Sequence, residues 1–306
     1  MKKVLYTALA LLLVSAVFVN CQKDGIFNPK QKISKVSQPL DGITLRLEEW
    51  TWEGDLLSRI SYFHRDTIVK NKVYYFYEKK QLVRMEYADF SYCTIKYDGS
   101  QYSEINFFTQ FERNTSTLKF TYEKKKVSQI VETRYANPQK SMGDAENKLM
   151  SAFFPKIVLE AMDKHMSKTA LQKANEDVVL THKLTYDDKG DNLKEWRISQ
   201  TLISKVGESM LTKLRETVLT YDSYDDKVNP YYASSPAGEG YAAFYKNNPT
   251  KVTFNMYEDN LPIAGSTDIF NYTYQYDDKK YPTEVIGRHL EGAAADTTYY
   301  EYKTGK

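Results

Sequence analysis

An aromatic residue followed directly by an acidic one recurs along this chain, and it leads each time into a short polar segment and then apolar positions. Among the first four copies the spacing is about 20 to 25 residues, which is the length of two strands and two turns. The copies start at Trp52-Glu53, Tyr77-Glu78, Tyr97-Asp98, Tyr122-Glu123, Tyr186-Asp187, Tyr221-Asp222 and Tyr276-Asp277, with a half-copy at Tyr302. This degenerate repeat constrains the fold more strongly than any other feature of the chain.

Each copy has the composition of a strand, a tight polar turn and a return strand. The strand segments KVYYFY, CTIKY, LKFTY, HKLTY, TVLTY and NYTYQY are rich in β-branched and aromatic residues, which favour sheets. The segments EKKQ, DGSQ, EKKK and DDKG suit exposed hairpin turns, and the acid after each tyrosine can accept N–H bonds there. We therefore predict a mainly β fold, a long antiparallel meander that is open or rolled, in a single domain over residues 41–306.

Residues 141–176 interrupt the strand pattern, and a helical insertion is predicted over about 144–176. Its apolar side chains follow a helical spacing at Leu149, Phe153, Ile157, Ala161 and Met162. Asp144 can cap the start, and Pro155 is tolerated near a helix beginning. We expect this insertion to cover the apolar face of the sheet; alternatively, helix and sheet enclose a groove for a lipid-like ligand.

The longest loop-like stretch is residues 229–250, which is rich in Pro, Gly, Ser and Asn. Loops of this length are often functional or mobile. This segment is therefore a candidate for a functional role.

The N-terminus has the layout of a secretory signal. Lys2 and Lys3 precede an uncharged apolar run over residues 4–19, which is too short for a comfortable membrane span of about 20 residues. Residues 1–20 are therefore predicted to be a signal peptide. Residues 21–40 are predicted to form a flexible tether between Cys21 and the domain.

The stretch Phe18-Val19-Asn20-Cys21 resembles a bacterial lipobox, in the looser form of Bacteroidetes lipoproteins. The resemblance implies that Cys21 becomes the lipid-modified first residue, which would anchor the protein to a membrane. The next residues, Gln22-Lys23-Asp24, resemble an export signal to the outer face of the outer membrane. An outer-membrane lipoprotein exposed on the cell surface is expected; the alternative is a plain signal peptide or an uncleaved anchor with an incidental cysteine.

A family resemblance covers roughly residues 40–303 and is strongest over 254–303. There FNYTYQYDDKKYPTEV and TTYYEYK resemble an uncharacterised family of Bacteroidetes lipoproteins, a domain of unknown function. That resemblance implies no active site. The repeats also resemble the Tyr-Asp repeats of Rhs-type shell proteins, although most copies lack the Gly that normally follows the turn.

Composition excludes several classes of function. The formal charge of +2 includes Lys2 and Lys3, so the mature chain is nearly neutral and lacks the concentrated basic surface that nucleic acid requires. Cys93 is the second of two cysteines, so with Cys21 lipidated no internal disulfide is possible, and Cys93 is expected to be a buried small hydrophobe.

No motif for catalysis, a cofactor or a metal emerges from the chain. The four histidines, His64, His165, His182 and His289, are scattered without metal-ligand spacing, and no zinc, phosphate-loop or nucleophile-elbow motif occurs. Side-chain oxygens of Asp187, Asp188, Asp191 and Asn192 could chelate Ca²⁺. Their spacing misses the EF-hand pattern, however, and turn chemistry predicts the same residues, so no metal or cofactor is expected.

Aromatic side chains offer a possible ligand site. Trp50, Trp52 and Trp196, with the 26 tyrosines, could stack against sugar rings. The alternative is that Trp50 and Trp52, two residues apart on a strand, point to one face and help to form the core.

The function expected is a non-enzymatic binding or structural role in the cell envelope, with the membrane as partner through the lipid anchor. The alternative is a glycan-binding module for polysaccharide capture, or a module for a protein partner. An envelope hydrolase ranks lowest; it would place two carboxylates about 5 to 10 Å apart in one concave site.

Overall fold

The computed structural model describes residues 31–64, 68–135, 149–150, 153–155, 157–161, 177–206, 209–232, 244–289 and 295–303. Within these ranges all strands belong to a single sheet, and each pairs antiparallel with its neighbour along the chain. The strands are β1 (Lys32–Leu40), β2 (Ile43–Glu53), β3 (Leu56–His64), β4 (Ile68–Glu78), β5 (Gln81–Tyr87), β6 (Tyr92–Asp98), β7 (Gln101–Phe108), β8 (Asn114–Glu123), β9 (Lys126–Arg134), β10 (Val178–Tyr186), β11 (Leu193–Val206), β12 (Ser209–Tyr224), β13 (Pro249–Glu258), β14 (Leu261–Pro262), β15 (Asp268–Tyr276), β16 (Pro282–His289) and β17 (Asp296–Lys303).

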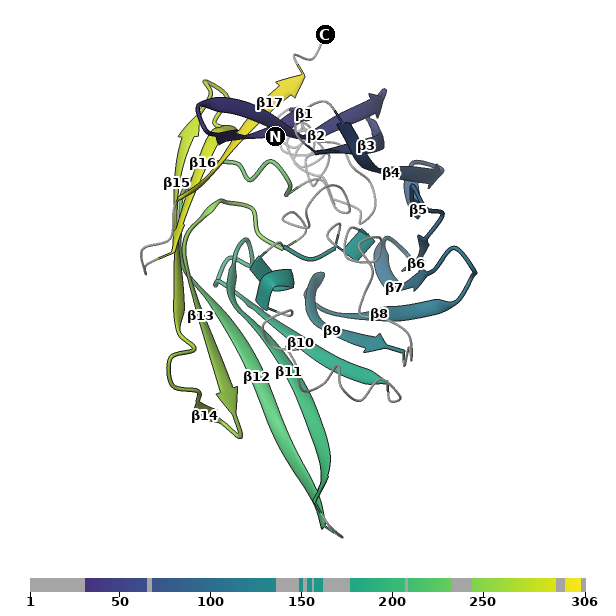
Figure 1. The fold of residues 1–306 in the computed structure, drawn as a ribbon, viewed down its shortest axis with the longest axis vertical. Coiled ribbons are helices and arrows are strands. Elements are labelled where there is room, and N and C mark those ends of the chain that lie inside the picture. Colours follow the sequence, from purple (N-terminus) through teal and green to yellow (C-terminus); the bar gives the residue numbers. More distant parts are fainter. Residues whose placement is uncertain are drawn as a thin grey trace, which may run out of the picture.

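The sheet closes on itself into a barrel (Figure 1). β17 pairs with β1, so that Tyr302 lies opposite Ile33 and Tyr300 opposite Val36. β14 has two residues and lies beside β13, which also pairs directly with β15; the other sixteen strands form the wall. The prediction of a mainly β meander is confirmed. The sequence left open whether the sheet is open or rolled, and the structure shows that it is rolled into a closed barrel.

The predicted tether over residues 21–40 is wrong at its C-terminal end. Residues 32–40 form β1, which hydrogen-bonds with both β17 and β2. A closed barrel leaves no free sheet edge, so this segment is held by a partner strand that lies more than 250 residues away in the chain. Residues 1–30, including the predicted signal peptide and Cys21, lie outside the described residues.

The predicted hairpin turns are confirmed at several copies of the repeat. Both central residues have a positive φ at Lys79-Lys80 (48° and 67°) and at Lys124-Lys125 (48° and 66°). This is the backbone of a type I′ turn, whose twist matches that of the two strands it joins. Lysine therefore takes a conformation that usually selects Gly or Asn, and the paired strands on each side hold it there.

Alternation along the strands divides the wall into an apolar inner face and a polar outer face. In β10, Leu180, His182 and Leu184 are buried, whereas Lys183 between them is exposed. Inward side chains around the barrel join one apolar cluster that includes Leu57, Leu82, Ile105, Leu118 and Trp196. The core of this protein thus lies inside the barrel.

The described residues between β9 and β10 lie in this interior (Figure 1). Its described residues form short helical turns at 149–150 and 157–161. Phe153 packs edge-on against Tyr102 and Phe107, and Phe154 packs on Trp196. We expect one kinked helix or two short ones here, packed on the apolar face of the sheet, and the described residues do pack against that face, inside the barrel. The rest of the predicted insertion, including Asp144 and Met162, lies outside the described residues. Within the described residues, no helix has the length and apolar character needed to cross a membrane.

A β-bulge follows the turn in most of the hairpins, and the tyrosines explain why the repeat persists there. In the β4–β5 hairpin, Tyr77 pairs with Leu82 and Phe76 with Arg84, which leaves Val83 as the extra residue. The hydroxyl of Tyr97, from the next copy, donates to the Leu82 carbonyl at 2.7 Å. A bulge disrupts the ladder locally, and the hydroxyl supplies a donor beside it.

The same contact recurs along the barrel. The hydroxyl of Tyr186 donates to the carbonyl of Val127 at 3.0 Å, that of Tyr224 to the carbonyl of Leu193 at 2.9 Å, and that of Tyr302 to the carbonyl of Pro282 at 2.8 Å. Tyr77 also forms a hydrogen bond with the backbone of Leu57. Each hydroxyl joins one repeat to the repeat before it. We call this set of contacts the tyrosine ladder; it explains much of the tyrosine excess as structure.

The acids of the repeat have the predicted turn role in the longer turns. The Asp187 carboxylate accepts from the Asp191 N–H at 2.9 Å, and that of Asp277 from the Tyr281 N–H at 2.8 Å. Asp222 is different, because it lies within β12 and accepts from the Thr253 hydroxyl. The sixth copy therefore starts at Tyr224-Asp225 and not at Tyr221-Asp222.

Candidate functional site

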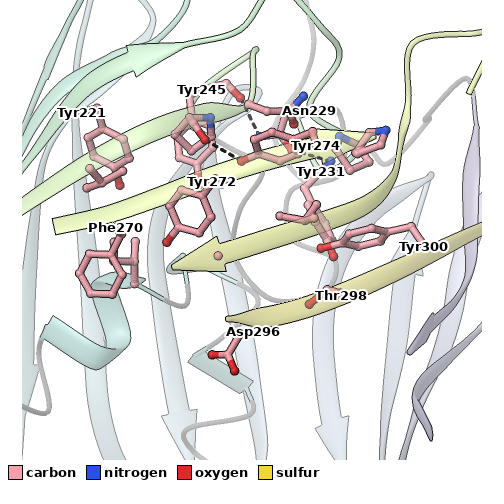
Figure 2. A pocket seen from close by; sticks show the side chains of 18 of the residues that line it. Tyr221, Asn229, Tyr231, Tyr245, Phe270, Tyr272, Tyr274, Asp296, Thr298 and Tyr300 are labelled. Atoms are coloured by element: carbon pink, nitrogen blue, oxygen red, sulfur yellow. Dashed lines mark hydrogen bonds between the residues drawn. The ribbon is translucent and has the colours of Figure 1, made fainter. Parts of the chain in front are cut away.

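A cavity of about 160 Å³ lies inside the barrel against β12, β13, β15, β16 and β17. Six tyrosines line it: Tyr221, Tyr231, Tyr245, Tyr272, Tyr274 and Tyr300. They come from three strands and from the loop between β12 and β13 (Figure 2). The predicted functional stretch 229–250 thus contributes to the lining through both of its described ends.

The strand period places these rings on the inner face. Phe270, Tyr272 and Tyr274 alternate with outward residues in β15, and Asp296, Thr298 and Tyr300 do so in β17. β16 lies between these two strands and contributes Val285 and Gly287, together with Pro282 and Arg288. The small side chains at 285 and 287 leave space beside the rings of β15.

Gly287 is required by the ring that covers it. Tyr272 is its register partner across β15 and β16. A Cβ at position 287 would lie 3.2 Å from Cε1 of Tyr272, which is tighter than ordinary van der Waals contact. Glycine therefore lets the Tyr272 ring lie against the sheet, where it forms part of the cavity.

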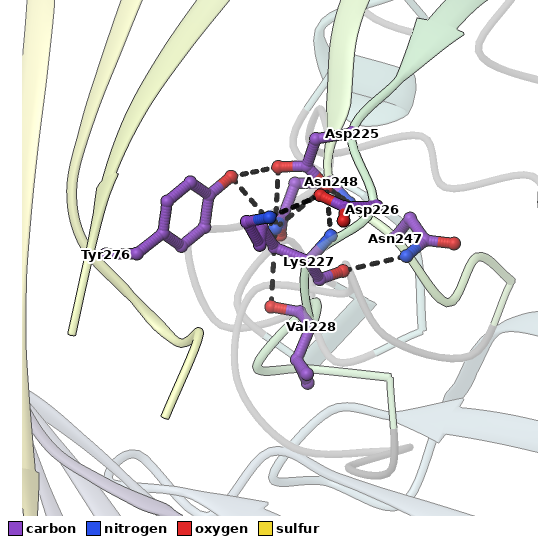
Figure 3. Close-up of polar contacts among 7 residues, drawn as sticks. All are labelled: Asp225, Asp226, Lys227, Val228, Asn247, Asn248 and Tyr276. Atoms are coloured by element: carbon purple, nitrogen blue, oxygen red, sulfur yellow. Dashed lines mark hydrogen bonds and ion pairs between the residues drawn. The ribbon is translucent and has the colours of Figure 1, made fainter. Parts of the chain in front are cut away.

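Polar contacts join the two described ends of the loop between β12 and β13 (Figure 3). The Asp225 carboxylate accepts from the hydroxyl of Tyr276 and from Nδ2 of Asn248. Nδ2 of Asn248 also contacts the Val228 carbonyl at 3.3 Å, and Nδ2 of Asn229 donates to the Tyr245 carbonyl at 3.1 Å. The two ends of the loop are thereby paired with each other and tied to β15.

A second group of contacts ties this loop to the turn between β10 and β11. Lys246 forms an ion pair with Asp191 at 2.9 Å, and Oδ1 of Asn192 accepts the N–H groups of Lys246 and Asn247. The Asp187 carboxylate accepts a hydrogen bond from Nδ2 of Asn192 at 3.4 Å, and another from the N–H of Asp191 within its own turn. Among the described residues, no group of three or more His, Cys, Asp or Glu side chains is arranged to hold a metal.

Tyr221 differs from the other cavity residues in the hydrogen bonding of its hydroxyl. It is 5% exposed, and its hydroxyl has no hydrogen-bond partner among the residues that the structure describes. Burying a hydroxyl without a partner costs about 1 to 3 kcal/mol, so such groups are rare and call for an explanation. The hydroxyl is itself fully buried, so it does not face the open space of the cavity.

The phenols of the cavity remain protonated over the physiological pH range. Burial raises the pKa of Tyr221, Tyr272 and Tyr274, since the charged form loses its hydration. For Tyr272 the nearby carboxylates of Glu160 and Asp296 raise the pKa further. The rings therefore present neutral donors, and both carboxylates lie near one of them.

A second polar cluster lies in the interior but is fully paired. Nε1 of Trp196 donates to Nδ1 of His182 at 3.1 Å, which assigns the proton to Nε2, 3.2 Å from Glu132. Arg134 forms an ion pair with the other oxygen of Glu132, and its charge contributes to lowering the pKa of Glu132 against the opposing effect of burial. Because both ring nitrogens of His182 are engaged, this cluster is structural.

The three tryptophans proposed for ligand stacking point inward. Trp50, Trp52 and Trp196 are 2%, 8% and 0% exposed, and Trp50 stacks on Trp52 with 6.2 Å between ring centroids. None presents a face to solvent, as the core interpretation of Trp50 and Trp52 predicted. A ligand could stack on these rings only after the interior opened.

The cysteine and the histidines that the structure describes lie outside the cavity lining. Cys93 is buried, as expected, and its burial raises the pKa of the thiol to about 12. His64 is exposed at the end of β3, and His165 lies outside the described residues. The sequence did not reveal the cavity residues Tyr221, Tyr272 and Asp296; the alternation in NYTYQY was the one available signal.

Comparison with known proteins yields a fold relationship. No protein-family model matches the chain, and no protein of curated function matches its sequence. A solved structure described as a porin-like protein from Bacteroides uniformis ATCC 8492 matches with a TM-score of 0.50, 12% identity, and coverage of 92% of this chain and 100% of that one. A second, a porin-like protein from Bacteroides vulgatus ATCC 8482, has a TM-score of 0.49, 13% identity and coverage of 90% and 99%. The chain is thus similar in fold to a porin-like barrel from Bacteroides.

Proposed function

We propose that this protein is a lipid-tethered, non-enzymatic binding protein of the outer membrane, whose barrel stands in water and holds a small ligand in the tyrosine-lined cavity. The observation that carries the binding role is the cavity of about 160 Å³ inside the barrel, which six tyrosines line.

Charged pairs on the outer wall support a barrel in water. Lys35 pairs with Glu301 at 2.8 Å, Arg84 with Glu86 at 3.0 Å, Lys96 with Glu104 at 2.7 Å and Arg197 with Glu216 at 3.2 Å. A barrel that spans a membrane instead presents an apolar outer band about 25 Å tall, and each Lys or Arg at its midplane costs about 2 to 4 kcal/mol. Four such cations argue against a wall in lipid.

Exposed apolar side chains do not form such a band. Leu40, Ile43, Phe90, Phe111 and Leu261 are exposed beside turns or within them. On the wall strands, β4 exposes Ile68, Val69, Tyr74 and Phe76, and β10 exposes Val179 near its start. The apolar surface is instead inside, where Phe153, Phe154 and the loop residue Tyr231 pack against the strands.

This arrangement is the reverse of a water-filled pore. A porin-type barrel has a polar lumen, whereas here one apolar cluster joins the wall to the inner segments. Tethering through Cys21 accounts for a membrane location without a spanning wall. The chain from Cys21 to Lys32 can extend about 40 Å at most, so the barrel would stay close to the bilayer surface.

The ligand-binding role is tested with the full chain as its host processes it, purified in a zwitterionic detergent. A library of small ring compounds is screened by ligand-observed NMR, and each hit is measured again on Tyr272→Ala, which removes a ring that lines the cavity, and on Tyr74→Ala, whose ring lies on the outer wall. Hits that weaken with Tyr272→Ala alone are expected. A screen without hits would refute the binding role, and turnover of a hit that stops with Asp296→Asn would make the protein an enzyme.

A further inference from the structure

We infer that one end of the barrel docks on the surface of a lipid bilayer, into which it inserts apolar side chains from neighbouring turns. This inference goes beyond the proposed function and requires neither a ligand in the cavity nor a lipid on Cys21. It follows from the distribution of exposed apolar residues, from the backbone of two turns and from the charges beside them.

The two ends of the barrel differ in chemistry. In an antiparallel meander successive connections alternate between the ends, so those after β1, β3, β5 and β7 lie at one end and those after β2, β4, β6 and β8 at the other. Large apolar residues are exposed at or beside the first set; we call them the apolar rim, and they are Leu40, Ile43, Ile68, Val69, Phe90 and Phe111. The second set instead exposes Gly54-Asp55, Lys79-Lys80, Gly99-Ser100 and Lys124-Lys125. One end therefore presents apolar side chains to its surroundings, whereas the other presents polar and charged ones.

Phe90 lies in the β5–β6 turn in a conformation that disfavours it. Its φ is 70°, and a bulky residue with a positive φ is an outlier, because that region favours Gly, Asn or Asp. Other groups close the turn: the Tyr87 N–H donates to the Ser91 carbonyl at 2.8 Å, and the Asp89 carboxylate accepts from the Ser91 N–H at 2.8 Å. Phe90 itself is 68% exposed. Strained positions gather at functional sites, so we assign this ring to a contact outside the barrel.

Phe111 repeats this arrangement in the β7–β8 turn. The Thr109 N–H donates to the Arg113 carbonyl at 2.9 Å, and the Thr109 hydroxyl accepts from the Phe111 N–H at 3.2 Å. Glu112 takes the positive φ here, at 60°, and Phe111 is 82% exposed. At two turns of the same end, a small polar side chain thus holds the turn while a phenyl ring projects from it.

The spacing of the rim residues favours a lipid surface over a protein partner. Strands lie about 4.8 Å apart, so turns that are two strands apart are separated by about 10 Å along the rim. A stable protein interface needs a closely packed apolar core and about 800 Å² from each partner, which separate turn tips do not form. A bilayer is fluid, and its interface accepts apolar side chains one by one to a depth of about 5 to 10 Å.

The charges beside the rim nearly cancel. The exposed acids are Asp41, Asp89 and Glu112, and the exposed bases are Lys70 and Arg113. Attraction to anionic lipid needs a cluster of Lys and Arg, and the described residues of this rim do not supply one. The surface that fits is therefore zwitterionic, with the insertion of apolar side chains as the source of affinity.

Docking of this kind leaves the wall in water. An insertion of about 5 to 10 Å covers about two or three residues of each strand, at about 3.3 Å per residue. Lys96, which pairs with Glu104, lies near the polar end of β6 and stays outside the bilayer. β1 begins at the polar end and spans about 30 Å, so the chain from Cys21 to Lys32, about 40 Å when extended, lets the rim reach the bilayer that would hold the anchor.

The test is quenching of tryptophan fluorescence by brominated lipid. The full processed chain is bound to phosphatidylcholine vesicles with or without bromine on the acyl chains. Phe111→Trp reports on the rim, and Lys125→Trp, in the β8–β9 turn, reports on the polar end; the three native tryptophans are buried and give a common background. The added emission of Phe111→Trp should be largely lost in brominated vesicles, at 50 mM and at 500 mM salt alike, whereas that of Lys125→Trp should remain. No loss for Phe111→Trp, or an equal loss for both, would overturn the inference.

Two variants in the Phe111→Trp background separate docking from folding. Phe90→Asn removes a ring of the rim and suits the positive φ of this turn, so it should keep or raise the denaturation midpoint. It should also shift the equilibrium from docked to free barrel about 3- to 10-fold, as half the burial of a phenylalanine implies, and so reduce the quenching. Phe76→Asn, on the outer wall, should leave the quenching unchanged. A lower midpoint for Phe90→Asn would make the ring structural and overturn its assignment to a membrane contact.

A protein contact through the rim is the competing outcome. If Phe111→Trp escapes quenching, and sedimentation shows a pair of chains that Phe90→Asn separates, the rim binds a second copy and the membrane inference is overturned. The ligand screen of the cavity has no bearing on either result, so the two proposals fail independently.

Discussion

Replacing Tyr97 by phenylalanine removes one hydroxyl of the tyrosine ladder and leaves the ring in place. The hydroxyl donates to the Leu82 carbonyl at 2.7 Å, and the ring contacts Tyr102 with 5.3 Å between centroids. Only the hydrogen bond is lost, so the variant isolates its contribution. If the ladder holds the repeats together, Tyr97→Phe must destabilise the barrel.

The expected destabilisation follows from the Leu82 carbonyl, which loses its hydrogen-bond donor in this variant. A buried acceptor deprived of its donor costs about 1 to 3 kcal/mol. For a domain of this size, 1 kcal/mol corresponds to a shift of about 2 °C in Tm, so Tyr97→Phe should lower Tm by about 2 to 6 °C. Tyr224 and Tyr302 make the same contact elsewhere on the barrel, and because distant sites add, a triple Tyr→Phe variant should lose about three times as much.

The assay is chemical denaturation followed by tryptophan fluorescence, since all three tryptophans are buried. Tyr74→Phe is the matched control, because its ring lies on the outer wall, and it should cost less than about 0.5 kcal/mol. If Tyr97→Phe proved as mild as this control, or the triple variant no worse than the single one, the ladder would not stabilise the fold.

Two further variants test the cavity and the buried cluster. Gly287→Ala places a Cβ 3.2 Å from the Tyr272 ring; it should cost about 1 kcal/mol and weaken ligand binding, and unchanged calorimetric affinity would contradict the geometry. Glu132→Gln removes the buried carboxylate that pairs with the partly buried Arg134 and with His182, and should cost about 1 to 3 kcal/mol at pH 7. The folded pKa of Glu132 is lowered, so its stabilisation is present above the unfolded value and is lost as pH falls through the folded one. Wild type and Glu132→Gln should therefore converge in denaturation midpoint at acidic pH, and a constant gap down to pH 3 would refute the assignment.

Local features of the fold could be read from the sequence. The Tyr-acid repeat predicted antiparallel hairpins, and the turns at Lys79-Lys80 and Lys124-Lys125 lie where it placed them. Closure could not be predicted, because β1 reads as the polar segment KISKVSQPL. It becomes a strand only when β17 lies beside it, which is a non-local contact without a local signal.

The orientation of the aromatic side chains was equally hidden. In the run Tyr74-Tyr75-Phe76, Tyr75 is buried inside, whereas its two neighbours face outward. The barrel also places the six tyrosines of the cavity on its inner side. The cavity brings Tyr221 together with Asp296 through five neighbouring wall strands, so neither residue was marked by its own surroundings in the chain.

The environment of the outer wall is the central claim, and cysteine labelling in isolated outer membranes tests it most directly. Lys183 lies exposed in the middle of β10, and Lys125 lies in the β8–β9 turn. Cys93 contributes little background, because it is buried and its pKa is raised to about 12. With a membrane-impermeant maleimide, Lys183→Cys should react at a rate similar to Lys125→Cys, as a wall in water requires. Protection of Lys183→Cys until detergent is added would place the wall in lipid and contradict the account.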